Sequence, residues 1–148
     1  MRKRIYIVCL LGFLLPGCFT GRLEFIDQQV RFAKKNTGLI REMAEYAIFF
    51  CHKNNIREFH TDMIADKTTR KKMSKLGWTV NVTYGASADG DSMVSFKNTS
   101  LNQGVQEFLY DFKTHPRNKG SEPTISKESA SIQVSERIYY RKGPFPMM

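Results

Sequence analysis

The stretch that decides the fold is Trp78-Thr79-Val80-Asn81-Val82-Thr83-Tyr84. Large apolar residues alternate with smaller polar ones, and this period of two predicts a half-buried β-strand. Most of the chain before it shows a helical period instead. Helices and strands thus follow one another in separate runs, which is typical of an α+β domain with helices packed on a small, mainly antiparallel sheet.

The residues after this strand predict three further elements. A partner strand is expected at Met93–Lys97, beyond a run of turn-forming residues, with Val94 and Phe96 facing the core. Residues 100–113 have apolar side chains at helical spacing and predict a helix. The last strand is expected at Ser131–Arg141.

Two features interrupt this C-terminal part. Glu136 breaks the apolar face of the last predicted strand, which indicates an exposed rim or a bulge. Residues 114–130 are polar and contain Pro116, Gly120 and Pro123. A segment of this length and composition predicts a mobile or functional loop.

The N-terminal half predicts helices. An apolar stripe at steps of three and four runs from residue 21 to about Asn54 and is interrupted at Asn36-Thr37-Gly38. Asn54-Asn55 indicates a helix end, and residues 56–76 predict another helix that ends before Gly77. The expected order is therefore α-α-β-β-α-β.

The first residues have the pattern of an export signal. Met1-Arg2-Lys3-Arg4 is strongly positive, and Ile5–Leu15 is an uncharged, almost wholly apolar run. As a helix this run is about 16 Å long, roughly half of the hydrocarbon core of a bilayer. Its length fits the apolar core of a signal sequence better than a transmembrane helix.

Leu15-Pro16-Gly17-Cys18 resembles the lipobox of bacterial lipoprotein precursors. The resemblance implies that residues 1–17 are removed and that acylated Cys18 attaches the protein to a membrane. Phe19 follows in place of the Asp that favours inner-membrane retention, so the periplasmic face of the outer membrane is expected in a Gram-negative cell. The alternatives are a secreted protein cut near Gly17 or Thr20, and an uncleaved anchor or buried helix.

Length, charge and cysteine count limit the kinds of protein that this chain can be. The chain has 148 residues, 23 Lys and Arg against 14 Asp and Glu, a net charge of +9 and three cysteines. This length predicts one domain, residues 18–148, and three cysteines exclude a disulfide scaffold. Without residues 1–17 the cations number 20, so the net charge falls to +6.

No group of residues predicts catalysis. Cys51 and His52 are adjacent on a predicted helix and point about 100° apart, so the imidazole is badly placed to activate the thiol. His52, His60, Asp62 and His115 lack the spacing of a zinc site, and Asp89-Gly90-Asp91 is only a fragment of a calcium loop. We therefore expect no catalytic residue, no bound metal and no cofactor.

Two sets of residues are candidates for contact with a partner or a membrane. The first set is basic and consists of Lys67, Arg70, Lys71, Lys72 and Lys75. The second set is predicted on the exposed side of the last strand and consists of Arg137, Tyr139 and Arg141. Nucleic acid is not expected as a partner, because the basic stretch has no interleaved aromatic residues.

Three functions remain open. The first is a non-enzymatic lipoprotein that binds a protein partner as an accessory subunit of an envelope assembly, such as a secretion, pilus or conjugation system, through an open sheet edge or groove. The second is a carrier of a small ligand or lipid, with a pocket lined by Phe49, Phe50, Trp78 and Phe108. The third is a secreted hydrolase with an unrecognised site.

Overall fold

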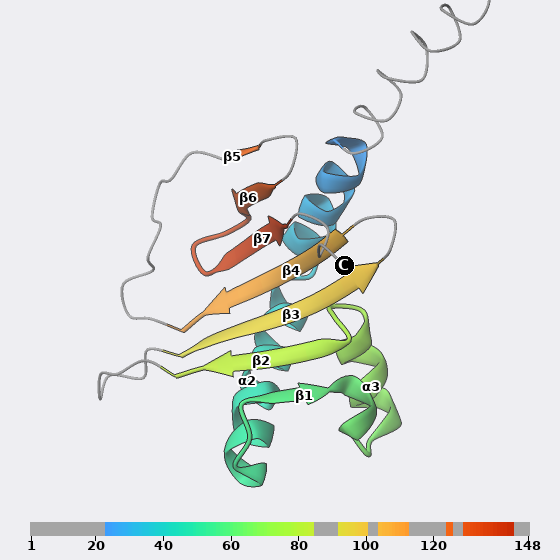
Figure 1. The fold of residues 1–148 in the computed structure, drawn as a ribbon, viewed down its shortest axis with the longest axis vertical. Coiled ribbons are helices and arrows are strands. Elements are labelled where there is room, and N and C mark those ends of the chain that lie inside the picture. The colour runs from blue at the N-terminus through green and yellow to red at the C-terminus, as the bar shows by residue number, and fades with distance from the viewer. Residues whose placement is uncertain (1–22, 85–91, 101–103, 113–123, 126–128, 144–148) are drawn as a thin grey trace, which may run out of the picture. The chain divides into compact units, whose positions relative to one another are not determined.

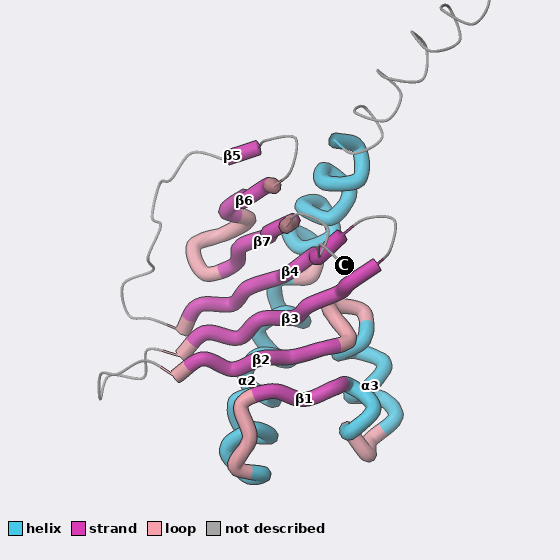
Figure 2. The backbone as a smooth tube through the Cα atoms, in the orientation of Figure 1, coloured by secondary structure: helices cyan, strands magenta, loops and turns pink. Residues whose placement is uncertain are grey.

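The computed structural model describes residues 23–84, 92–100, 104–112, 124–125 and 129–143 (Figures 1 and 2). The chain divides into two units, Met1–Phe32 and Ala33–Met148. Residues 23–32 are the described part of the first unit; they are helical, and Arg31 forms an ion pair with Asp27. The export signal with Cys18, the turn at 85–91 and most of the predicted 114–130 loop lie outside the described residues.

Helix α2 (Thr37–Asn54) begins after Asn36, a turn residue, so the predicted interruption of the helical stretch is confirmed. The helix ends as expected at Asn55, which has the left-handed values φ 53° and ψ 43°. The Ile56 N–H then donates to the Cys51 carbonyl oxygen (N···O 3.0 Å) and satisfies a terminal acceptor. Its buried residues are Ile40, Met43, Ala44, Ala47 and Cys51. No helix among the described residues is long and apolar enough to cross a bilayer.

The strands of the second unit form one antiparallel sheet, and helix α2 contacts β2, β3 and β4 (Figure 1). The strands are β1 (Glu58–His60), β2 (Thr79–Thr83), β3 (Met93–Ser100), β4 (Gly104–Asp111), β5 (Thr124–Ile125), β6 (Ala130–Gln133) and β7 (Ile138–Lys142). Their spatial order is β1-β2-β3-β4-β7-β6-β5. The predicted α+β class, with helices ahead of an antiparallel sheet, is confirmed.

One row of apolar side chains crosses five neighbouring strands. Consecutive members are directly opposite one another in the ladders, and each is at most 4% exposed. The row consists of Phe59, Val80, Phe96, Phe108 and Tyr140. The Phe50 ring of α2 is 4.7 Å from the Phe59 ring, centroid to centroid, so the row and the helix share one core.

The predicted helix over residues 56–76 is wrong in its first part. This stretch forms β1, a 3-10 turn η1 (Thr61–Met63) and only then helix α3 (Lys67–Ser74). Phe59 and Ile64 are buried as expected, but Phe59 lies in β1 and Ile64 directly follows η1. Pairing of Phe59 with Val80 overrides a local spacing that resembled a helix.

The predicted helix over residues 100–113 is also wrong, because this region contains strand β4 and Ser100 belongs to β3. Phe108, Leu109, Tyr110 and Asp111 are all at most 6% exposed. Burial on both faces removes the alternation that identifies a strand, and the remaining apolar spacing imitates a helix.

The last predicted strand is a hairpin of β6 and β7, joined by a turn at residues 134–137 that contains Glu136. Strand β7 lies between β4 and β6 and is therefore not an edge of the sheet. Tyr139, which was expected to be exposed, is only 5% exposed because it has neighbours on both sides, Leu109 and Gln133. Arg141 is exposed and Arg137 is half-buried.

Gly77 connects α3 to β2 where the backbone of β3 leaves no space for a side chain. A Cβ atom at this position would lie 2.6 Å from the Lys97 backbone nitrogen and 2.7 Å from the Phe96 carbonyl carbon. The close approach lets the Trp78 N–H donate to the Lys97 carbonyl oxygen (N···O 3.0 Å). Gly77 therefore fixes where β2 begins.

We expect Gly77→Ala to lower the free energy of unfolding by about 2 kcal/mol, because backbone atoms must move to admit the methyl group. Gly38→Ala is the matched control, since nothing lies within 4 Å of its Cβ position in helix α2. The control should raise stability by about 0.5 kcal/mol. Urea unfolding of the full chain measures both, and equal effects of the two substitutions would contradict the packing argument.

Candidate functional site

Strand β1 is an edge of the sheet within the described part of the chain. Its pairing with β2 continues beyond both ends of the strand: the Val82 N–H donates to the Arg57 carbonyl oxygen (N···O 2.8 Å), and the Thr61 N–H donates to the Trp78 carbonyl oxygen (2.9 Å). In an antiparallel strand, residues alternate between pointing their backbone groups toward and away from the partner. The N–H and C=O groups of Glu58 and His60 therefore point away from β2.

Two large apolar side chains are exposed next to this edge. Trp78 is 52% exposed and Met63 is 55% exposed. The His60 and Trp78 rings are stacked, with centroids 6.2 Å apart and planes at 17°. We call the outward backbone of Glu58 and His60, together with Met63 and Trp78, the β1 edge site. Exposed Trp and Met side chains next to an open strand are features of a surface that a partner can cover.

His60 also contacts an acid. Its Nδ1 atom is 3.0 Å from Oδ2 of Asp62, and both side chains are well exposed. The described residues contain no group of three or more His, Cys, Asp or Glu side chains able to hold a metal ion. The pair is thus a local contact at the end of β1, and His115 lies outside the described residues.

The structure separates the basic residues of α3 into two classes. The Arg70 side chain turns inward, and its Nε and Nη2 atoms donate to the carbonyl oxygens of Ile64 (2.9 Å) and Ala65 (3.3 Å). Lys72 Nζ is 2.7 Å from Glu42 Oε1 on α2. Both residues have structural roles, whereas Lys67, Lys71 and Lys75 are exposed.

Asp66 caps the N-terminus of α3. Its Oδ2 atom accepts a hydrogen bond from the Thr69 N–H (2.6 Å). Hydrogen bonds from the Thr69 side chain and backbone lower the pKa of the Asp66 carboxyl, because they stabilise its charged form. The carboxylate therefore holds the start of the helix, one residue before Lys67.

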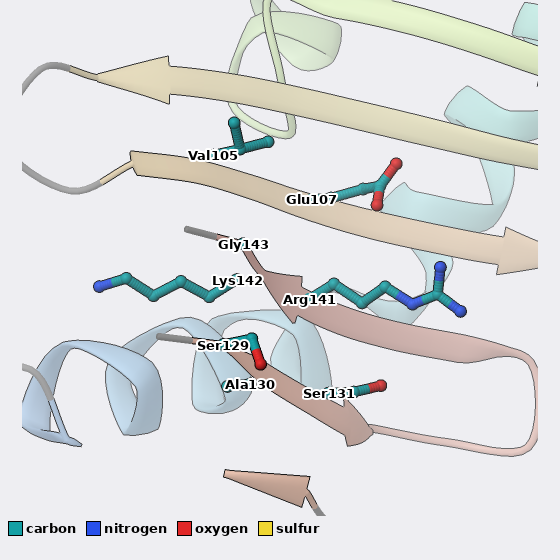
Figure 3. Close-up of a pocket in the computed structure, with 8 residues that line it drawn as sticks. All are labelled: Val105, Glu107, Ser129, Ala130, Ser131, Arg141, Lys142 and Gly143. Atoms are coloured by element: carbon teal, nitrogen blue, oxygen red, sulfur yellow. The ribbon is translucent and has the colours of Figure 1, made fainter. Parts of the chain in front are cut away.

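Arg141 lines a cavity of about 290 Å³ on β4, β6 and β7, together with Glu107, Ser131 and Lys142 (Figure 3). In Figure 3 the Arg141 and Lys142 side chains extend in opposite directions along the strand. Glu107 accepts a hydrogen bond from Ser95 and lies 4.0 Å from Lys97 Nζ. Its carboxylate is thus already engaged by neighbours on β3.

Arg137 and Tyr139, the other two predicted surface residues of the C-terminal hairpin, are less exposed than Arg141. Arg137 Nη1 donates to the Asp111 carbonyl oxygen (3.1 Å) and holds the β6–β7 turn against the end of β4. Tyr139 is buried, as described above. The three residues predicted as one exposed surface therefore do not form one.

Cys51 and His52 line a second cavity, of about 250 Å³, with Arg57 and Tyr84. The Cys51 side chain is 0% exposed, and burial raises the pKa of its thiol. A nucleophilic cysteine needs a lowered thiol pKa, since the thiolate is the reactive form. Cys51 therefore acts as a small apolar side chain of α2.

The four aromatic residues expected to line a ligand pocket are not brought together. Phe108 is in the core row, Phe49 is 65% exposed on α2, and Trp78 belongs to the β1 edge site. A cavity of about 410 Å³ does exist at the start of α2, but Arg41, Tyr110 and Arg137 are among its lining residues and none of the four aromatics is. The specific pocket proposed for a carrier is absent from the described residues.

The β1 edge site was not found from the sequence, because a three-residue strand is too short to give a periodic signal. A visible clue was Trp78, an aromatic residue that directly follows a glycine and precedes the strand. No family model, no curated protein and no solved structure matches this chain.

We predict that Cys51 reacts slowly with iodoacetamide in the folded protein. The test uses a chain with Cys9→Ser and Cys18→Ser, in which Cys51 is the one remaining thiol. Burial and the raised pKa should slow alkylation at pH 8 by at least about tenfold relative to the same chain in urea. Equal rates in the two conditions would show that the thiol is accessible.

Proposed function

We propose that the protein is an exported lipoprotein, tethered to a membrane through acylated Cys18, whose domain binds a partner protein at the β1 edge site. In this role it is a non-enzymatic accessory subunit of an envelope assembly such as a secretion, pilus or conjugation system. The observation that carries the binding proposal is the open edge of β1 next to exposed Trp78 and Met63.

An extended segment of the partner would add to the sheet beside β1. The backbone groups of Glu58 and His60 offer two donors and two acceptors in the plane of the sheet, which is the requirement for strand addition. A strand of three residues supplies few hydrogen bonds, so much of the affinity must come from side chains. Trp78 and Met63 provide apolar area for this purpose, and Trp is enriched among residues that dominate binding energy.

The membrane tether also favours binding of the partner. Each buried CH₂ group of an acyl chain contributes about 0.8 kcal/mol, and two or more chains give stable anchoring. A protein held at a membrane meets a partner in the same membrane at a raised effective concentration. At this raised effective concentration, weak strand addition at a short edge is sufficient to hold the partner.

The tether is tested by metabolic labelling with an alkyne analogue of palmitate. We expect wild type and Cys9→Ser to be labelled, because Cys9 lies in the removed leader, and we expect Cys18→Ser to lose the label. Fractionation of the same cells should place the labelled chain with the membranes. Labelling of Cys18→Ser at the wild-type level would refute acylation at this position.

The edge is tested by substituting His60, whose φ of −90° lies about 25° from the value near −65° that proline prefers. His60→Pro removes one outward N–H and leaves the ladder to β2 intact, whereas His60→Ala keeps the N–H and removes only the ring. In pull-downs from solubilised envelope membranes, a partner bound by strand addition should be retained by His60→Ala. With His60→Pro, the amount of partner that is captured should fall about tenfold.

Trp78→Ala completes this series and should weaken capture of the same partner by about thirtyfold, because it removes the largest exposed side chain of the site. Circular dichroism of each variant controls for folding. Undiminished capture by His60→Pro would exclude strand addition at β1. Undiminished capture by Trp78→Ala would place the binding surface elsewhere.

A further inference from the structure

Three exposed lysines form one stripe along α3. Lys67, Lys71 and Lys75 follow one another at intervals of four residues, which places them on one helix face about 6 Å apart along the axis. Lys75 is the C-cap residue, but its φ of −69° and ψ of −26° are helical and continue the stripe. We call these three residues the lysine stripe.

The surrounding residues leave the stripe strongly positive. The nearest acid in the sequence, Asp66, is engaged as the N-cap of α3. Glu42 of α2 pairs with Lys72, which lies off the stripe. Within the described part of the chain, the ion pairs formed by basic residues do not include any of the three stripe lysines.

We propose that the lysine stripe lies against anionic lipid headgroups. This inference rests on the proposed function in one respect, because the tether keeps the domain close to a bilayer. Lysine is a flexible point charge and suits phosphates that have no fixed arrangement, whereas arginine provides the planar fork that recognises a particular carboxylate or phosphate. In α3 the one arginine is directed into the protein, and the exposed basic side chains are all lysines.

The alternative occupant is an acidic segment of a protein. Such a segment would be expected to engage apolar or aromatic neighbours as well as charges. The exposed residues directly next to the three lysines in the sequence are Asp66 and Thr68, and both are polar. The composition of this face therefore favours a lipid surface.

The test measures how strongly the full chain partitions onto vesicles of phosphatidylcholine with and without phosphatidylglycerol. All chains carry Cys18→Ser, so that no acyl chain contributes. The stripe variant replaces Lys67, Lys71 and Lys75 with Gln. The matched control replaces three other exposed lysines, Lys34, Lys35 and Lys53, with Gln and loses the same net charge.

Each lysine near an anionic surface strengthens binding roughly fivefold, so the stripe variant should lose on the order of 100-fold in partitioning onto the anionic vesicles. The control variant should lose much less, and neither should change on neutral vesicles. Added salt should reduce the difference, because it screens the charges. Equal losses in the two variants, or no dependence on phosphatidylglycerol, would overturn the proposal.

The experiment also separates this inference from the proposed function. Loss of partner capture by the stripe variant, without any dependence on phosphatidylglycerol, would assign the stripe to an acidic protein and overturn the lipid proposal. Failure of palmitate labelling at Cys18 would remove the tether but leave the vesicle result unchanged, because the vesicle chains are not acylated.

Discussion

The row of side chains from Phe59 to Tyr140 is the constraint on which the second unit depends. It joins five strands to one another, and contact between Phe50 and Phe59 joins β1 to helix α2. Strand β1 has three residues, so its one buried side chain, Phe59, fixes its position against both the sheet and the helix. The exposed edge that we propose for partner binding is therefore held by the same core that stabilises the domain, and this core keeps the outward backbone groups of the edge in place.

The sequence was informative wherever one face of an element is buried and the other is exposed. Val80 and Val82 are predicted correctly for this reason. The end of α2 is predicted from the turn-forming pair Asn54-Asn55. Strand β4 was missed because both of its faces are buried near its end. The sequence predicts one strand in place of the β6–β7 hairpin because the turn contains four residues, so Ile132 and Tyr140 keep the same parity and Glu136 alone interrupts the alternation.

The sequence predicts which types of residue form the candidate surfaces, but not how these residues are arranged in space. The basic composition of residues 67–75 identified a positive surface, but only the structure shows that Arg70 and Lys72 are used internally. The sequence places Tyr139 on the exposed face because it alternates with Ile138 and Tyr140, but its neighbours on β4 and β6 bury it. Trp78 was assigned to the core because it continues the alternation of β2, but the strand begins one residue later and the side chain is left exposed. These differences all depend on which elements lie next to each other, and the local pattern of the sequence does not show this.

The strand order has a consequence for how the protein folds. Strands β1 to β4 are neighbours both in the sequence and in the sheet, and so are β5 to β7, so the sheet consists of two meanders joined where β4 pairs with β7. Local pairings form faster than distant ones, because less chain must be ordered to close them. Until β7 arrives, β4 is an open edge of eight residues with Phe108 and Tyr110 uncovered, much longer than the three residues of β1. A partly folded chain that has formed β1 to β4 but has not yet paired β7 with β4 would thus expose a longer strand edge than the finished domain.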